Sequence, residues 1–275
     1  MWIDSHQHFW LMRDRIGQWP PPELAKIHRD FLPPDLEPTL KACGVKGTVL
    51  VQSLPTMADT DFMLRLADQH PFILGVVGWV DLKAADAAVH IERLAAHPKL
   101  RSLRPMLQDI ADLAWIDDPV LDPAIRAMRS YGLRFDALVM PQHLEALTIF
   151  AKRHPDLPIV IDHGAKPHIA TGHFRAWRTA MAALGLLPNV HCKLSGLLTE
   201  AGERREPASL RPYVETILEI FGATRVLWGS DWPVLELAGE YQEWLALCLD
   251  LVPVADHAAV FGTNACDFYG LPHAA

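Results

Sequence analysis

The segment Pro158-Ile159-Val160-Ile161-Asp162-His163 is a short apolar run, rich in β-branched residues, that ends in two polar residues. A run of this kind predicts a buried β-strand. Similar runs recur along the whole chain. Counting residues 158–163, we expect eight strands. The other seven cover residues 2–8, 47–53, 73–81, 102–107, 134–139, 190–195 and 226–231.

Segments with helical spacing separate many of these strands. Their ends coincide with residues that begin or stop helices, as where Asp59 begins one segment and Gly132 and Gly222 follow two others. The predicted helices cover residues 59–70, 84–97, 119–131, 143–154, 174–184 and 210–221. Alternation of apolar strands with helices is typical of a parallel sheet covered by helices.

Eight such units predict an α/β fold, a single-domain (β/α)8 TIM barrel over residues 1–275. An open doubly wound sheet is the alternative, but the chain lacks a Gly-x-Gly-x-x-Gly motif after an early strand. Residues 10–36, rich in proline, tryptophan and charge, are too long for a tight connection. We expect them to form an extended loop over the mouth of the barrel.

Composition narrows the classes of function. Half of the 275 residues are hydrophobic, which is enough for one large core, and the net charge is −8. That charge, with no basic cluster, argues against a nucleic acid or an anionic membrane as partner. The four cysteines form no Cys-x-x-Cys pair, and we find neither a signal peptide nor an apolar run of transmembrane length. We therefore expect a cytoplasmic protein with reduced thiols.

Polar residues stand at the carboxyl ends of the predicted strands, where barrel enzymes build their active sites. His6 and His8 lie two apart in the first strand, so their imidazoles share one face. Burying an unpartnered polar group costs about 1–3 kcal/mol, so each needs a partner or a function. The remaining candidates, on strands four to eight, are Arg104, Asp136, His163, Lys193, Ser195 and Asp231.

Each candidate also has a structural interpretation. Asp162, rather than His163, could point inward, and Arg104 could belong to a buried ion pair. Asp136 is better explained as support for a neighbouring histidine than as a catalytic group. Lys193 could lie at the surface and Ser195 in a turn. Asp231 has no obvious structural need, since it follows Gly-Ser at the end of a buried strand.

Four motifs carry a resemblance to a known family. They are Asp4-Ser-His-Gln-His-Phe-Trp10, Ile161-Asp-His-Gly-Ala-Lys-Pro167, Lys193-Leu-Ser-Gly196 and Gly229-Ser-Asp-Trp-Pro233. Together they resemble the amidohydrolase superfamily, and within it the amidohydrolase-2 branch of sugar-lactone and pyrone-lactone hydrolases. The resemblance extends over about residues 2–271 and implies a distorted (β/α)8 barrel with one active site at its carboxyl-terminal face.

The chain departs from the two-metal members of that superfamily. Those proteins carry a bridging Lys or Glu on strand four and a His ligand on strand five, where this chain has Arg104 and Asp136. The resemblance therefore implies no bridged two-metal centre. We expect His6, His8 and Asp231 to hold one weakly bound divalent ion, zinc or manganese. The same residues also allow a reaction without metal, as in some relatives that open lactones.

The resemblance implies a hydrolase that opens a sugar-acid lactone, a small-molecule aldonolactone. Asp231 would activate the attacking water, and three imidazoles, those of His6, His8 and His163, would polarise the carbonyl group. Arg104 would hold a substrate oxygen through its planar guanidinium. We expect the remaining substrate contacts from Trp10, Trp79 and Lys193.

Three alternatives stay open. A metal-dependent decarboxylase of the same superfamily would need the strand-five histidine that Asp136 replaces. A pyrone-dicarboxylate lactonase would need several arginines for its substrate carboxylates, and we find one convincing candidate. A non-catalytic barrel would tolerate loss of the histidines and Asp231, all of which are present. Fold alone does not separate these functions.

Overall fold

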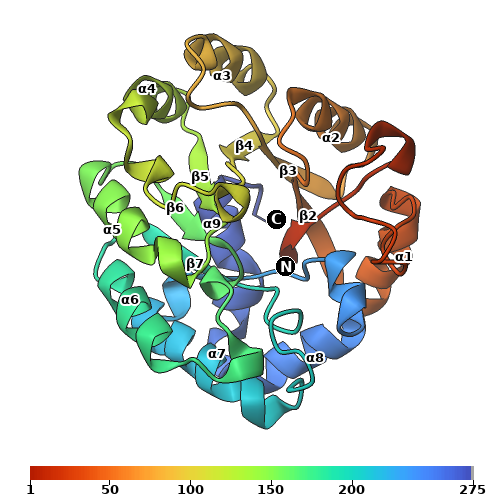
Figure 1. Ribbon diagram of the computed structural model, residues 1–275. Coiled ribbons are helices and arrows are strands. Elements are labelled where there is room, and N and C mark those ends of the chain that lie inside the picture. The colour runs from red at the N-terminus through yellow and green to blue at the C-terminus, as the bar shows by residue number, and fades with distance from the viewer. Residues whose placement is uncertain (274–275) are drawn as a thin grey trace.

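Eight parallel strands follow one another in sequence order around a barrel in the computed structural model, which describes residues 1–273 (Figure 1). This confirms the predicted fold, and the last two residues of the predicted domain lie outside the described part. The strands are β1 (Trp2–Gln7), β2 (Val45–Val51), β3 (Ile73–Gly78), β4 (Leu100–Leu103), β5 (Arg134–Ala137), β6 (Ile159–Ile161), β7 (Val190–Leu194) and β8 (Val226–Trp228).

Helices surround the barrel (Figure 1). They are α1 (Pro33–Cys43), α2 (Met57–Gln69), α3 (Ala87–Ala95), α4 (Asp122–Ser130), α5 (Leu144–Arg153), α6 (Arg175–Gly185), α7 (Pro207–Phe221), α8 (Tyr241–Leu251) and α9 (Asn264–Tyr269). The sequence patterns miss α1, α8 and α9. In α1, Pro33 and Pro34 occupy the first two positions, where proline is well tolerated. The loop after β1 therefore ends at Leu32 and not at residue 36.

The strands end earlier than the apolar runs predict. β6 ends at Ile161 and β8 at Trp228, so the polar residues that follow them lie outside the hydrogen-bonded strands. His163 and Asp231 both have left-handed backbone conformations, with φ of 55° and 61°. Such conformations are uncommon outside glycine and turn each side chain away from the strand direction.

The barrel closes loosely between its first and last strands. β1 forms no strand ladder with β8 within the described chain; Gln7 of β1 forms an isolated bridge with Trp232, in the turn after β8, and the hydroxyl of Ser5 donates to the carbonyl of Trp228 at 2.7 Å. Two backbone hydrogen bonds form this seam: the amide of His8 donates to the carbonyl of Trp232, and that of Asp231 donates to the carbonyl of His6, each at 2.8 Å. The backbone that closes the barrel thus belongs to three of the predicted site residues.

The C-terminal helix α9 covers one end of the barrel. In Figure 1 it is seen through the ring of strands. Phe268 and Tyr269 of α9 pack against a cluster of apolar side chains from the strands. The strand residues of this cluster are Ile3, Val49, Val51, Val77, Val160 and Leu227. The larger apolar core lies between the strands and the outer helices. The barrel end that faces away from α9 is therefore the one free for a site.

No single helix within residues 1–273 has the length and apolar composition to cross a membrane. α8 and the segment Val254–Tyr269 meet that test only when taken together, and they are bent by 114° relative to each other. α9, at the end of that segment, packs in the core cluster described above.

Candidate active site

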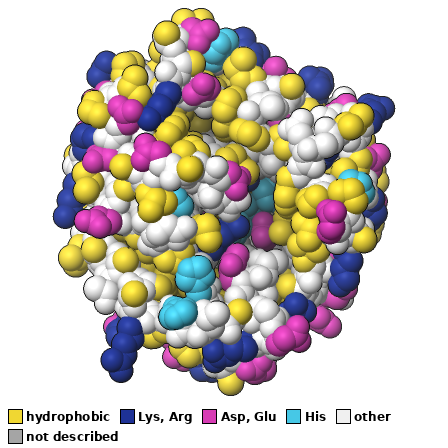
Figure 2. All heavy atoms as spheres, viewed as in Figure 1, with side chains coloured by type: hydrophobic (Ala, Val, Ile, Leu, Met, Phe, Trp, Pro, Cys, Tyr) yellow, Lys and Arg dark blue, Asp and Glu magenta, His cyan; other side chains and the backbone are white. Residues whose placement is uncertain are grey.

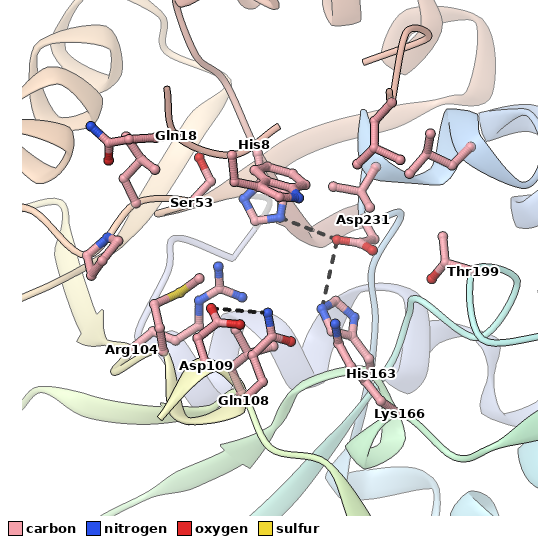
Figure 3. Close-up of a pocket in the computed structure, with 18 of the residues that line it drawn as sticks. His8, Gln18, Ser53, Arg104, Gln108, Asp109, His163, Lys166, Thr199 and Asp231 are labelled. Carbon is pink, nitrogen blue, oxygen red and sulfur yellow. Dashed lines mark hydrogen bonds and ion pairs between the residues drawn. The ribbon is translucent and has the colours of Figure 1, made fainter. Parts of the chain in front are cut away.

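A cavity of about 470 Å³ opens at the carboxyl-terminal end of the strands. Figure 2 shows it as a hollow with histidine, acidic and basic side chains in its wall. This volume lies within the range for small-molecule sites. Besides apolar residues, its lining includes His8, Gln18, Trp19, Ser53, Arg104, Gln108, Asp109, His163, Lys166, Thr199, Glu200 and Asp231 (Figure 3).

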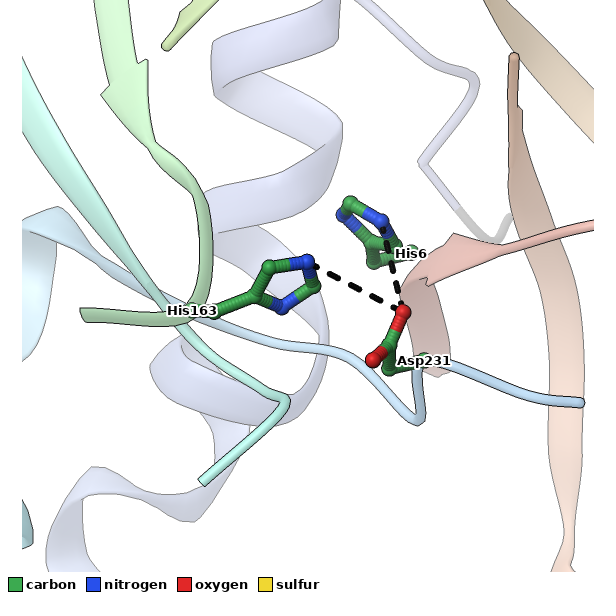
Figure 4. Close-up of side chains that lie close together, drawn as sticks. All are labelled: His6, His163 and Asp231. Carbon is green, nitrogen blue, oxygen red and sulfur yellow. Dashed lines mark ion pairs between the residues drawn. The ribbon is translucent and has the colours of Figure 1, made fainter. Parts of the chain in front are cut away.

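One carboxylate oxygen lies at the centre of the predicted site. The Oδ1 atom of Asp231 is 3.3 Å from Nε2 of His8, 3.7 Å from Nε2 of His6 and 3.8 Å from Nε2 of His163. Asp231 and His163 point toward each other and His6 lies beside both (Figure 4). The structure thus brings together the four residues that the sequence singled out for catalysis.

The carboxylate of Asp4 binds the turn that carries Asp231. It accepts hydrogen bonds from the amide of Ser230 at 2.9 Å, the hydroxyl of Ser230 at 2.6 Å and the hydroxyl of Tyr241 at 3.0 Å. Gly229 allows this close approach, because a Cβ atom there would lie 2.7 Å from that of His6. The first and last motifs therefore fit together as one unit.

The next two motifs position His163. Its Nδ1 atom is 2.9 Å from the hydroxyl of Ser195, so Ser195 is a hydrogen-bonding partner and not only a turn residue. Gly196 packs directly against the imidazole, and a Cβ atom there would lie 2.5 Å from Nδ1. Asp162 points the other way, into the barrel interior, where its carboxylate meets Arg104 at 3.1 Å.

The hydrogen bonds of His8 determine which of its nitrogens faces the cavity as an acceptor. Nδ1 lies 2.7 Å from the carbonyl oxygen of Val51, which can only accept, so Nδ1 carries a proton. In a neutral imidazole Nε2 is then also an acceptor, and it faces the Oδ1 atom of Asp231 at 3.3 Å. Two acceptors at this distance favour a proton or another cation between them.

The donor atoms fit a single divalent ion. Ligand atoms of His6, His163 and Asp231 all lie within 4.8 Å of one another. Imidazole nitrogen and carboxylate oxygen suit zinc or manganese, and three protein ligands leave a position open for substrate or water. In this group His163 takes the place that we predicted for His8. Nη1 of Arg104 is 3.5 Å from Nε2 of His6, and this nearby positive charge works against tight binding.

A buried charge network lies behind His6. The Lys193 ammonium is 3.1 Å from Nδ1 of His6, 2.6 Å from Asp136 and 3.0 Å from Asp162, and the side chain is fully buried. Ser102 and Tyr269 also donate to Asp136, at 2.5 and 2.6 Å. Lys193 thus lies behind the imidazole and outside the cavity wall, which does not fit the substrate contact predicted for it. The structural interpretation of Asp136 agrees with its position.

The surroundings set the charge of the central groups. Burial acts to raise the pKa of Asp231, but the facing histidines outweigh it and hold that pKa below its ordinary value. Burial lowers the pKa of His163 to about 4, and together with Lys193 it takes the pKa of His6 well below its ordinary value. At neutral pH the site therefore contains an ionised carboxylate beside two neutral imidazoles.

The predicted substrate contacts are placed unevenly. Arg104 lies in the cavity wall, but its guanidinium also donates to Asp162 and to the carbonyl of Gln52. Within residues 1–273 the wall contains neither Trp10 nor Trp79. Trp10 is fully buried and donates to the carbonyl of Arg29 at 2.7 Å, so it belongs to the core. Trp19, from the long loop, faces the cavity instead.

Several wall residues were not singled out from the sequence. They lie on loops after the strands, namely Gln18, Ser53, Gln108, Asp109, Thr199 and Glu200. Loop residues have no periodicity, so no pattern marks them. Lys166 is different, because it stands in the quoted motif after β6 and has a left-handed backbone with φ of 49°. That motif was the one available signal for it.

Comparisons with known proteins match the chain over nearly its whole length. It is 56% identical over 275 residues to an L-fucono-1,5-lactonase of Burkholderia ambifaria, covering 97% of this chain and 94% of that protein. It is 34% identical over 288 residues to an L-fucono-1,5-lactonase of Burkholderia multivorans, covering 99% and 97%. A crystal structure of a Burkholderia multivorans amidohydrolase with bound zinc is 35% identical, with a TM-score of 0.91 and coverage of 99% and 100%.

The match to the amidohydrolase family extends over residues 3–271 and includes the eight strands apart from Trp2, and every site residue described above. The four motifs, the near-closed barrel and the His-His-Asp group at its carboxyl-terminal end agree with that match. This chain belongs to the amidohydrolase family.

Proposed function

We propose that this protein is a hydrolase that opens a sugar lactone, with an aldono-1,5-lactone as substrate. The two relatives named as L-fucono-1,5-lactonases support the substrate class. The observation that carries the proposal is the Asp231 carboxylate, with imidazole nitrogens at 3.3–3.8 Å, in the wall of a cavity of about 470 Å³. Such a group serves a reaction in which water attacks a carbonyl carbon.

Asp231 takes the proton from the attacking water. Its depressed pKa keeps it ionised at neutral pH, so it is available as a base. The water oxygen bonds to the lactone carbonyl carbon, and the carbonyl oxygen becomes an oxyanion. The ring C–O bond then breaks, and Asp231 returns the proton to the departing ring oxygen. One water is consumed, and the product is an open-chain hydroxy acid.

His6 and His163 stabilise the oxyanion as hydrogen-bond donors. Lys193 donates to Nδ1 of His6 at 3.1 Å, closer than the 3.5 Å between Nη1 of Arg104 and Nε2 of the same ring. Ser195 can donate to Nδ1 of His163. These contacts favour an N–H at Nε2 of both rings. His8 differs, because its Nδ1 proton is held by the carbonyl of Val51. In the neutral ring its Nε2 atom therefore carries a lone pair and does not act as a donor to the oxyanion.

His6, His163 and Asp231 would hold a divalent ion such as zinc or manganese. When bound, it would polarise the carbonyl and lower the pKa of a coordinated water. With the ion bound, His6 and His163 would act as its ligands and no longer as hydrogen-bond donors to the oxyanion.

The charge of the cavity wall favours a neutral substrate over a dicarboxylate. Besides imidazoles, the wall has two cations, Arg104 and Lys166, and three carboxylates, Asp109, Glu200 and Asp231. A pyrone diacid would meet a net negative wall, which opposes its binding. For the decarboxylase alternative, Asp136 occupies the strand-five position and is bound to Lys193, away from the cavity.

A substrate panel tests the proposal. The purified protein is mixed with L-fucono-1,5-lactone, other aldonolactones and 2-pyrone-4,6-dicarboxylate, and acid release is followed with a pH indicator, with and without a chelator. We expect acid release from sugar lactones without release of CO2, and the chelator arm measures the need for metal. Turnover of the diacid alone, or of no lactone, would refute the proposed function.

A further inference from the structure

Lys166 and Glu200 form a charged pair in the cavity wall that the reaction steps above do not use. Lys166 follows β6 and Glu200 follows β7, and both line the cavity. The ammonium nitrogen lies 4.0 Å from the nearer carboxylate oxygen. The two side chains are 23% and 24% exposed, so both reach the open space while being largely desolvated. Lys166 lies next to His163 in Figure 3.

The backbone holds this pair in place. Lys166 precedes Pro167 and has φ of 49°, a conformation that a non-glycine residue keeps only when its surroundings impose it. Among the described residues, the non-glycine residues with positive φ are His163, Ala165, Lys166 and Asp231. Three of these four line the cavity. Lys166 thus shares an uncommon backbone conformation with two of the central site residues.

A second contact ties the loop of Glu200 to that of Lys166. The amide of Ala170 donates to the carbonyl of Glu200 at 3.0 Å, and the guanidinium of Arg204 donates to the carbonyl of Ile169 at 3.3 Å. The loops after β6 and β7 therefore hold the backbones of Lys166 and Glu200 close to each other. This is the preorganisation that a binding site requires.

The hydrogen-bonding capacity of the pair is unspent. Within residues 1–273, the Glu200 carboxylate accepts no hydrogen bond and the Lys166 ammonium donates none, apart from their mutual ion-pair contact at 4.0 Å. Asp109 differs, because it accepts from Gln108 at 3.5 Å (Figure 3). A carboxylate offers about four acceptor sites and an ammonium three donors. Ring hydroxyls can use both, since each hydroxyl donates one hydrogen bond and accepts others.

We infer that Lys166 and Glu200 bind neighbouring ring hydroxyls of the lactone and determine which sugar is accepted. Glu200 accepts from one hydroxyl and Lys166 donates to the same hydroxyl or to the next one. The inference rests on the proposed function, because it assigns the substrate groups that the same cavity contacts. A site built to bind a hydroxyl strongly disfavours an analogue that lacks it, since its own polar groups then lose their partner.

The test compares variants on matched substrates. Glu200→Gln and Lys166→Met are assayed on the sugar lactone that the wild type hydrolyses best and on analogues that each lack one ring hydroxyl. On the full lactone we expect kcat/KM to fall about 10- to 100-fold, mostly through KM, as is usual for a lost charged hydrogen bond. On the one analogue that lacks the contacted hydroxyl, the same substitution should cost less than about threefold, because the interaction is already absent.

Controls separate recognition from support of the loops. Glu203→Gln and Lys152→Met remove the same charges from exposed positions and should leave kcat/KM within about twofold. Glu200→Asp and Lys166→Arg serve as conservative variants if the first pair folds poorly, as judged by the melting temperature. Equal losses on every lactone would show that the pair only braces the loops and would overturn the inference. If the wild type hydrolysed no lactone, the proposed function itself would be refuted. That outcome depends on the wild-type assay alone and not on the variants.

Discussion

At the scale of single residues, hydrogen-bonding partners assign different tasks to three similar imidazoles. His8 gives its Nδ1 proton to a backbone carbonyl, whereas Lys193 and Ser195 face the Nδ1 atoms of His6 and His163. The Nε2 atoms of His6 and His163 are therefore suited to donate and that of His8 to accept. This difference follows from groups on other strands, so the His-x-His spacing alone could not reveal it.

One partly buried imidazole outside the site makes stability depend on pH. His191 in β7 packs against Phe268 with the two rings tilted, at 4.8 Å between ring centroids, and its Nδ1 atom has no partner within the described chain. Burial, helped by Arg225, lowers the pKa of His191 to about 4 from the ordinary 6.5. Between these values the unfolded chain binds more protons than the folded one, so stability falls as pH falls from 6.5 to 4.

The free energy of unfolding of the wild type falls as pH is lowered, and we expect His191→Phe to reduce this fall by about 2 kcal/mol, after allowing for the partial exposure of the ring. The free energies of unfolding of wild type and variant are compared by urea denaturation at pH 7 and pH 4.5. Relative to the wild type, the variant should have a higher free energy of unfolding at pH 4.5 than it has at pH 7. A difference that is the same at both pH values would contradict this account of His191.

At the scale of elements, the turn after β7 sets the position of His163. Gly196 has φ of +63°, and a Cβ atom there would lie 2.5 Å from the imidazole. Gly196→Ala should therefore displace His163 and lower kcat/KM about 100-fold, the size of effect expected when a reacting group moves by about 1 Å. Gly132→Ala is the control, because it has φ of +66° with open space around the Cβ atom.

Both alanine variants should lose about 1 kcal/mol or more of stability, because both force alanine into a left-handed conformation, and Gly196→Ala should lose more because its Cβ atom also overlaps His163. Only the variant at Gly196 should lose activity. Melting temperature and kcat/KM are measured on both proteins. If Gly132→Ala lost as much activity as Gly196→Ala, backbone strain and not contact with His163 would explain the effect.

The elements that the sequence predicted are those with a repeated pattern. Apolar runs such as Ile159–Ile161 revealed all eight strands, and the polar residues after them marked His163 and Asp231. The short helix α9 has no such pattern, because its position depends on packing against the barrel end. Trp10 and Lys193 were placed wrongly for a related reason. Their position in the chain fits a cavity wall, but tertiary contacts bury both of them.

At the scale of the whole molecule, buried charges join much of the barrel. Lys193 of β7 contacts Asp136 of β5 and Asp162 after β6, and Tyr269 of α9 contacts the same Asp136. The Lys193 ammonium and the guanidinium of Arg104 balance the two carboxylates. Breaking such a buried network by removing one partner leaves an uncompensated charge, which is strongly destabilising.

Lys193→Met should therefore destabilise the protein by about 3–5 kcal/mol, because two buried carboxylates lose their shared cation. Chemical denaturation measures this loss. Lys152→Met, at an exposed position, should change the free energy of unfolding by less than about 0.5 kcal/mol. If Lys193→Met were as stable as wild type, the network would not contribute to holding the barrel together.

The seam that closes the barrel also forms the site. Backbone hydrogen bonds of His6, His8 and Asp231 join β1 to the turn after β8, and the side chains of the same residues meet at the Oδ1 atom of Asp231. We propose that this carboxylate is the base for lactone hydrolysis. The first and last strands of the barrel would then act together in one chemical step.

The most direct test is the kcat/KM of Asp231→Asn on L-fucono-1,5-lactone, with Asp250→Asn as an exposed control. The substitution keeps the side-chain volume and removes the base. We predict a loss of about 1,000-fold, within the range for general-base catalysis, with folding intact by circular dichroism and the control within about twofold of wild type. A folded Asp231→Asn variant that retains activity within about tenfold of wild type would show that Asp231 is not the base.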